Sequence, residues 1–263
     1  MKKYLFIYKT EIMSNISYAF NLITGFVGYF IHIFIFLNLW KYIYSNPKEL
    51  INGYSMNQMV WYVIVTEILW MCIGGRKLCK QIISDVRTGN VAYNINRPYS
   101  YILYQLFSNL GRFTVKFVLF TILGVVMGLV FLQEFPNISV LGIILVLLSS
   151  FLATIINTLF VIVIGLFSFF IEDSNPFYWV YSKFILVVGT LFPIEYFPKV
   201  IQPVIKASPI FAVSYAPAKM FVDFNINNVF YILLVQLVYV VISYTLCLFI
   251  YRKGVKNINV NGG

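Results

Sequence analysis

Long stretches without a charged residue constrain this chain more than any other feature of its sequence. Asp, Glu, Lys and Arg are absent from residues 12–40, 135–171 and 224–251. A helix needs about 20 mostly apolar residues to cross the hydrocarbon layer of a membrane, because lipid cannot hydrogen-bond an exposed backbone. Only 11% of the 263 residues are charged and 60% are apolar or aromatic. This composition excludes a soluble enzyme, a secreted module and a disordered tail.

The apolar runs predict an all-α polytopic membrane protein with six transmembrane helices. The spans are expected at residues 20–44, 57–73, 113–132, within 135–171, at 175–192 and at 229–250. The fifth of these is the least apolar. The connections between the spans are too short to form a separate soluble domain, so residues 1–263 are expected to form a single transmembrane domain.

The basic residues predict the orientation of the chain in the membrane. The net charge is +10, and the Lys and Arg residues stand between the apolar runs. If the N-terminus is inside, twelve Lys and Arg residues fall on inner segments and five on outer ones. Short cytoplasmic loops carry an excess of Lys and Arg, so both termini are expected in the cytoplasm. The partner that this charge indicates is the anionic face of a lipid bilayer and not nucleic acid.

The first nineteen residues predict a helix that lies on the membrane surface. Leu5, Phe6, Ile12, Met13 and Ile16 share one face of a helix. Such an interfacial helix would rest on the inner leaflet and lead into the first span. The alternative is a frayed start to a long first helix.

The sequence has no motif for chemistry within the chain. It contains no nucleotide-binding G-x-x-x-x-G-K-[ST], no zinc-binding H-E-x-x-H and no nucleophile motif G-x-S-x-G. The single histidine, and three cysteines without metal-ligand spacing, predict neither a metal site nor a disulfide framework. We therefore expect no catalytic residue, no metal and no cofactor in this chain, and an energy source on another chain.

Two ionisable residues are expected at membrane depth. Glu67 lies within the second span and His32 about midway along the first. A charge at the centre of a bilayer costs about 2.5–3.5 kcal/mol on insertion scales, so such groups face protein or water. One hypothesis is a translocation path lined by Glu67, His32 and Asn157, with Glu67 attracting a cationic group. The alternative is a structural, neutral Glu67 that is hydrogen-bonded to His32 or Asn157. Lys116, together with Arg112 one turn earlier, is interpreted as extending to the lipid headgroups.

The inner connection between the second and third spans has the pattern of a docking element. Gly89 can end one helix, Asn90 can open the next, and Pro98 can end it. A short helix at about residues 90–96, mostly uncharged and flanked by basic residues, favours contact with another protein. The alternative is a helix that rests on lipid headgroups.

The outer stretch before the last span is rich in proline. Residues 191–219 carry five of the nine prolines between apolar residues. The segment is too apolar for a loop in water and too broken for a span, which predicts a re-entrant hairpin of short helices. Its expected gate residues are Pro193, Phe197, Pro198 and Pro209.

These two segments carry a family resemblance. The run Gly-Asn-Val-Ala at residues 89–92, followed by Asn-Arg-Pro at 96–98, and the proline-rich segment 191–210 are similar to motifs of one group of permeases. The chain resembles the permease subunits of bacterial ABC-2-type ATP-binding cassette transporters, in the branch of uncharacterised and multidrug-type exporters with paired permeases.

The resemblance implies a mechanism and a set of partners. Two permease subunits, identical or paralogous, would enclose a pathway in the bacterial plasma membrane, and two ABC ATPase subunits holding ATP and Mg would dock from the cytoplasm. The loop from Asp85 to Pro98 would insert a coupling helix into an ATPase groove, and the outer hairpin would act as a gate. The implied coupling residues are Asp85, Arg87, Gly89, Asn90, Tyr93, Arg97 and Pro98. The exported substrate would be a drug, a lipid, a peptide or a glycan.

Two other classes stay open at this stage. A lipid-modifying membrane enzyme would gather acidic or His residues at headgroup level, whereas Glu172-Asp173 is the only acidic pair. A secondary transporter is often built from internal repeats, and the halves of this chain show none.

Overall fold

The protein is an all-helical bundle in the parts of the chain that the structure describes. The computed structural model describes residues 2–17, 23–44, 49–91 and 97–261. Within them the only β feature is an isolated bridge between Ile51 and Tyr54. The longer helices are α1 (Lys2–Ser17), α2 (Ile23–Ile43), α3 (Met56–Ile73), α4 (Gly75–Arg87), α6 (Tyr101–Leu132), α7 (Val140–Leu166), α8 (Asn175–Ile185) and α11 (Ile226–Asn261). The short segments are η2 (Phe167–Phe169), η3 (Leu186–Leu191), η4 (Ile194–Tyr196), α9 (Gln202–Lys206), η5 (Phe211–Tyr215) and α10 (Ala216–Val222).

Five stretches of the described chain are long and apolar enough to cross a membrane. They lie in α2, in α3 together with α4, in α6, in α7 and in α11. These helices correspond to five of the six expected spans. The third begins earlier than expected, at Tyr101. The remaining expected span, 175–192, consists of the 11-residue α8 and the six-residue π-helical segment η3, and is not among the five.

Local hydrogen bonds explain where two of these helices begin. Ser55 caps α3: its Oγ accepts from the Gln58 N–H at 3.3 Å, while the Gln58 side chain accepts from the Ser55 N–H at 2.9 Å. Ser139 caps α7 by accepting from the Gly142 N–H at 3.1 Å. Each cap satisfies backbone donors that the first turn of a helix leaves free.

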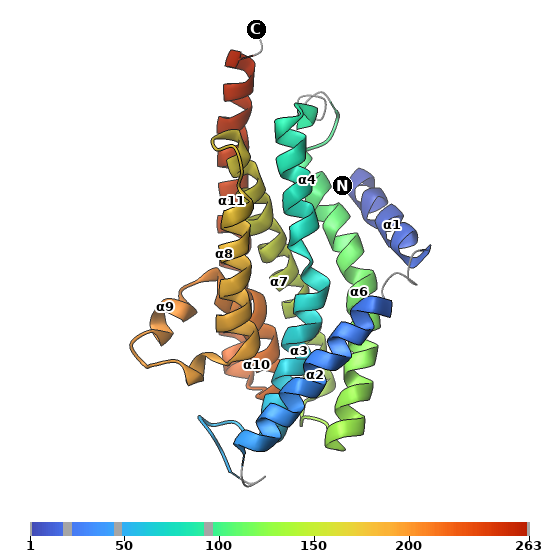
Figure 1. Cartoon of the computed structure of the whole chain (residues 1–263), viewed down its shortest axis with the longest axis vertical. Helices are drawn as coiled ribbons and strands as arrows, with labels where there is room; N and C mark the ends of the chain where they lie inside the picture. The colour runs from blue at the N-terminus through green and yellow to red at the C-terminus, as the bar shows by residue number, and fades with distance from the viewer. Residues whose placement is uncertain (1, 18–22, 45–48, 92–96, 262–263) are drawn as a thin grey trace.

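The long helices stand side by side, as Figure 1 shows. Helices α3 and α4 form one column, with α6 and α7 packed against it and α11 packed on α7. Helix α1 lies against α6, and both α1 and the C-terminal end of α11 lie in the upper half of the view. The short segments η4, α9 and α10 lie in the lower half, at the other end of the bundle from the α4–α6 connection (Figure 1).

The surface of the bundle is apolar where a membrane would surround it. Val27, Phe30 and Phe34 of α2 and Phe230 and Leu234 of α11 are all exposed. An apolar surface continuous over several helices is unstable in water and is expected against lipid or another subunit. Helix α1 also exposes apolar side chains, which fits the expected interfacial helix: Leu5, Phe6, Met13 and Ile16.

Helix α6 approaches α3 closely through a glycine. A Cβ at Gly128 would lie 2.2 Å from the Trp61 ring, and the Trp61 Nε1–H donates to the Glu134 carbonyl at 3.0 Å. Small residues allow helices in a membrane to pack at short range, where van der Waals contact drives association. The contact therefore requires glycine at this position.

The proline-rich part of the chain, residues 186–222, is built from short helical segments, as the proline pattern predicts. The backbone of the π-helical segment η3 receives two side-chain donors from α3: the Tyr62 hydroxyl donates to the Gly189 carbonyl at 2.7 Å, and Thr66 to the Thr190 carbonyl at 3.0 Å. The Gln236 amide of α11 donates to the Ala212 carbonyl of the π-helical segment η5 at 2.8 Å. Broken backbone at membrane depth is stable only when protein satisfies its polar groups in this way.

Replacement of Gly128 by valine is expected to destabilise the bundle. The added side chain would overlap the Trp61 ring, and overpacking of a closely packed contact costs typically about 1–3 kcal/mol. Thermal unfolding of the purified protein in detergent measures the effect. The control is Gly28→Val, because a Cβ at Gly28 meets nothing within 4 Å. Equal midpoints for the two variants would contradict the packing argument.

Candidate functional site

The column formed by α3 and α4 bends at a glycine pair. Gly74 separates the two helices and has φ +25° and ψ 50°. The next residue lies close to two other helices: a Cβ at Gly75 would lie 2.7 Å from Val161 of α7 and 3.1 Å from the Tyr178 ring of α8. The bend therefore needs glycine for its backbone angle and for this close approach.

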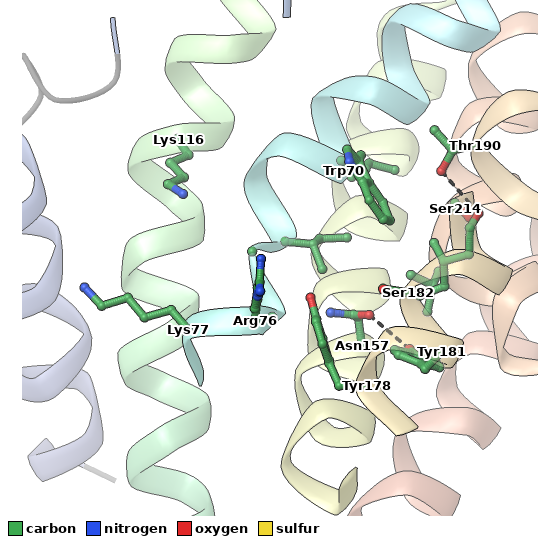
Figure 2. Close-up of a pocket in the computed structure, with 16 residues that line it drawn as sticks. Trp70, Arg76, Lys77, Lys116, Asn157, Tyr178, Tyr181, Ser182, Thr190 and Ser214 are labelled. Carbon is green, nitrogen blue, oxygen red and sulfur yellow. Dashed lines mark hydrogen bonds between the residues drawn. The ribbon is translucent and has the colours of Figure 1, made fainter. Parts of the chain in front are cut away.

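A pocket of 380 Å³ opens beside this bend. Figure 2 shows it between α3, α4, α6, α7 and α8. Its lining residues are Leu69, Trp70, Ile73, Gly74, Gly75, Arg76, Lys77, Lys116, Asn157, Tyr178, Tyr181, Ser182, Ile185, Thr190, Val213 and Ser214. The volume is at the lower end of the range that is typical of small-molecule sites.

One side of the pocket is cationic. Arg76 and Lys77 come from the first turn of α4 and Lys116 from α6, and no carboxylate is among the lining residues. None of the ion pairs found within the described ranges includes these three cations. The bend thus brings Lys116 together with a basic pair that lies about 40 residues earlier in the chain.

The other side is polar and uncharged. The Tyr181 hydroxyl donates to Asn157 Oδ1 at 3.0 Å, a contact that is visible in Figure 2. Thr190 of η3 and Ser214 of η5 continue this wall. Ser214 is 1% exposed, and its Oγ has no hydrogen-bond partner in the described part of the protein. Other buried hydroxyls of the described residues, such as that of Ser149, also lack a partner, but Ser214 is the one of these that lines the pocket.

The structure separates the three residues expected to line a translocation path. Glu67 is 1% exposed, and its Oε2 lies 3.3 Å from His32 Nδ1, whose side chain is 48% exposed on α2. Asn157 lies instead in the pocket and is bonded to α8. Glu67 therefore has the protein partner that the structural alternative requires, and the path residues do not form one site.

The inner loop is anchored at both of its ends. Asp85 accepts a hydrogen bond from the Tyr101 hydroxyl at 2.7 Å, and Arg87 Nε donates to the Glu172 carbonyl at 2.6 Å. At the far end, Lys3 donates to the Pro98 carbonyl. Nothing in the sequence predicts this contact between Lys3 of α1 and Pro98.

The middle of the loop is described only in part. Gly89 has φ +73° directly after α4, in agreement with a helix end, and Asn90 follows with helical backbone. Arg97 donates to the Tyr99 hydroxyl at 2.6 Å. Tyr93 and most of the expected helix at 90–96 lie outside the described residues.

A carboxylate that is not among the residues expected from the sequence holds the proline-rich segment together. Glu195 of η4 accepts hydrogen bonds from Tyr54, at 2.9 Å, and from Tyr215. Lys219 lies 3.6 Å from Glu195 and 4.4 Å from the centroid of the Tyr54 ring. Burial, followed by the neighbouring Tyr215 and Glu195, raises the pKa of Tyr54 well above its usual value, so this phenol remains a donor.

The expected gate residues lie around this cluster. Pro193 precedes η4, and Phe197 and Pro198 follow it. Pro209 stands just before η5 and therefore near the pocket wall that contains Ser214. Among the described residues no group of three His, Cys, Asp or Glu side chains could hold a metal ion.

Fold and composition together define a multi-pass helical membrane protein. Residues 27–262 match the family model described as ABC-2 family transporter protein. This match covers most of the chain, so the protein belongs to the ABC-2 transporter family and is a membrane permease of ABC transport, not itself catalytic. The family implies association with an ABC ATPase. A comparison with curated proteins finds no match.

Replacement of Glu67 tests its pairing with His32. We expect Glu67→Gln to unfold near the wild-type temperature, because an amide can still hydrogen-bond to the imidazole. Glu67→Ala should lower the free energy of unfolding by about 1–3 kcal/mol, because it removes a buried side chain and leaves His32 without this partner. Thermal unfolding in detergent measures both. Wild-type stability of Glu67→Ala would contradict the pairing, and loss of transport by a stable Glu67→Gln protein would show that Glu67 acts in the translocation path.

Proposed function

We propose that this chain is the permease subunit of an ATP-driven exporter and couples to a separate ATPase through the loop from Asp85 to Pro98. The observation that carries the proposal is the anchoring of this loop on three other parts of the chain. Asp85 is bonded to α6, Arg87 to the segment before α8, and Pro98 to α1. A loop fixed in this way would transmit a push from a docked ATPase to the bundle as a rigid-body movement.

A continuous route runs from this loop toward the other end of the molecule. Helix α4 continues into α3, and α3 is bonded to η3 through Tyr62 and Thr66. Through these bonds, tilting of α4 by ATP-driven closure of the ATPases would move the base of the outer hairpin. This route supports the assignment of the hairpin as the gate and of Gly74 as a bending point.

The proposed assembly contains two permease subunits, identical or paralogous, and two ABC ATPases that hold ATP and Mg. In this proposal α8 with η3 makes the fifth of six crossings of a bacterial plasma membrane, and both termini are cytoplasmic. The position of α1 and of the C-terminal end of α11 in the same half of Figure 1 supports an even number of crossings. Export is the direction that the resemblance favours.

Changes in the loop are expected to uncouple the ATPase. Gly89→Pro cannot adopt φ +73° at the end of α4, and Tyr93→Asp places a charge in the expected docking helix. In the reconstituted complex with its ATPase, each should lower substrate-stimulated ATP hydrolysis by roughly fivefold or more, the lower end of ordinary coupling energies. Membrane insertion should remain normal.

Two matched variants control for nonspecific effects. Gly89→Asn should retain coupling, because Asn tolerates positive φ better than other side chains. Asn137→Asp adds the same charge to the connection between α6 and α7, at the other end of the bundle, and should leave hydrolysis unchanged. Wild-type hydrolysis in both Gly89→Pro and Tyr93→Asp would overturn the coupling proposal.

The Glu195 cluster is expected to keep the hairpin closed. Glu195→Gln removes the charge that Tyr54 and Lys219 face, and hydrogen bonds to a charged group contribute about 1.5–3 kcal/mol. Hydrogen–deuterium exchange of residues 193–210 should become faster. Asp223→Asn is the control: Asp223 pairs with the same Lys219 at 2.9 Å, but its side chain is 53% exposed. An equal change in both variants would show that the cluster does not close the hairpin.

A further inference from the structure

Three cations line one pocket that contains no carboxylate, although the Lys77 side chain extends away from the other labelled residues in Figure 2. Arg76, Lys77 and Lys116 line it, and within the described residues no ion pair or hydrogen bond of their side chains is found. Like charges gathered at a concave and partly apolar surface repel one another, and their field concentrates anions there. In Figure 2 all three basic side chains lie on the same side of the labelled group.

We propose that this pocket binds an anionic group, a phosphate or a carboxylate, carried on an apolar body. The first turn of α4, which carries Arg76 and Lys77, contributes to the same wall. A guanidinium can also hold two anionic oxygens at once.

The apolar part of the ligand is indicated by the rest of the lining. Leu69, Trp70, Ile73, Ile185 and Val213 present apolar surface next to the cations. A small inorganic anion would leave this surface in water, whereas an amphiphile would cover it. A volume of 380 Å³ fits a head and a short apolar portion, so a longer chain would extend out of the pocket.

The uncharged side of the pocket indicates a second polar contact. Within the described residues, the buried Ser214 hydroxyl has no partner, and Asn157 accepts from Tyr181 through its one side-chain oxygen while its amide nitrogen makes no hydrogen bond. A hydroxyl, ester or amide on the apolar body of the ligand would meet these groups. The ligand would then be oriented with its anionic head toward α4 and α6.

This inference rests on the proposed function and deepens it, because it assigns the permease a class of ligand that binds between α4 and the proline-rich hairpin. It rests on the membrane placement that the family shows and not on the coupling loop. Binding is therefore measured on the purified permease without ATP, so a failed binding test and a failed coupling test are distinguishable.

The experiment measures binding of three probes to the full chain in neutral detergent by native mass spectrometry. Dodecyl phosphate carries the anion on a single chain, dioleoyl phosphatidylglycerol carries it as a bilayer lipid, and dodecanol is the uncharged match. The test variant is Arg76→Gln with Lys116→Gln. The control variant is Lys9→Gln with Lys80→Gln, which removes equal charge from exposed positions outside the pocket.

We expect dodecyl phosphate to bind the wild type more tightly than dodecanol does. Its affinity should fall roughly tenfold or more in the test variant and remain unchanged in the control. If phosphatidylglycerol also binds the wild type and loses affinity only in the test variant, membrane lipid is a source of the anion. If dodecyl phosphate alone behaves in this way, the source is a free amphiphile. Equal loss in both variants, or equal binding of dodecanol, would overturn the proposal.

Two further variants separate loss of binding from loss of folding. Arg76→Lys with Lys116→Arg keeps both charges and should bind dodecyl phosphate within a few-fold of the wild type, because the charge-assisted contacts remain. If the double Gln variant fails to fold, binding of dodecyl phosphate is measured on Lys116→Gln alone, because Lys116 lies on α6 and its replacement does not change the first turn of α4. Wild-type affinity in a folded Lys116→Gln protein would then overturn the proposal.

Discussion

Side-chain donors from neighbouring helices bond to backbone carbonyls of both π-helical segments, and the packing of these segments depends on these bonds. Tyr62 and Thr66 of α3 donate to η3, and Gln236 of α11 donates to η5. At membrane depth no water replaces a lost donor, and an unsatisfied carbonyl costs several kcal/mol. The broken helices are therefore tied to α3 and α11, and a movement of either long helix would carry its π-helical segment with it.

The same constraint explains how the scarce charges are distributed. Glu67 has His32, and Glu195 has two tyrosines and Lys219, so both of these carboxylates have partners within the chain. The three cations of the pocket differ from them, because no ion pair of the described residues includes these cations and no carboxylate lines their pocket. Cations gathered at a concave surface concentrate anions there.

Prediction from the sequence succeeded where the information is local. Runs of apolar residues predicted five spans, and the prolines predicted the broken outer segment, because both follow from neighbouring residues. The pocket depends on contacts across the chain. The glycine pair before Arg76 permits the bend, but nothing in the sequence placed Lys116 beside it. The sequence offered His32 or Asn157 as the partner of Glu67, and only the packing of α2 on α3 selects His32.

The position of α4 connects the two proposals physically. Its C-terminal end carries Asp85 and Arg87 at the base of the coupling loop, and its N-terminal turn carries Arg76 and Lys77 in the pocket. A 13-residue helix is stiff over this length, so a displacement at one end reaches the other. Lys116 lies on α6, to which Asp85 is bonded through Tyr101. A movement of the loop that breaks the hydrogen bond between Asp85 and Tyr101 would separate α4 from α6, and with them Arg76 and Lys77 from Lys116. ATP-driven docking would then change the affinity of the pocket for an anion, and by thermodynamic linkage a bound anion would favour one docked state.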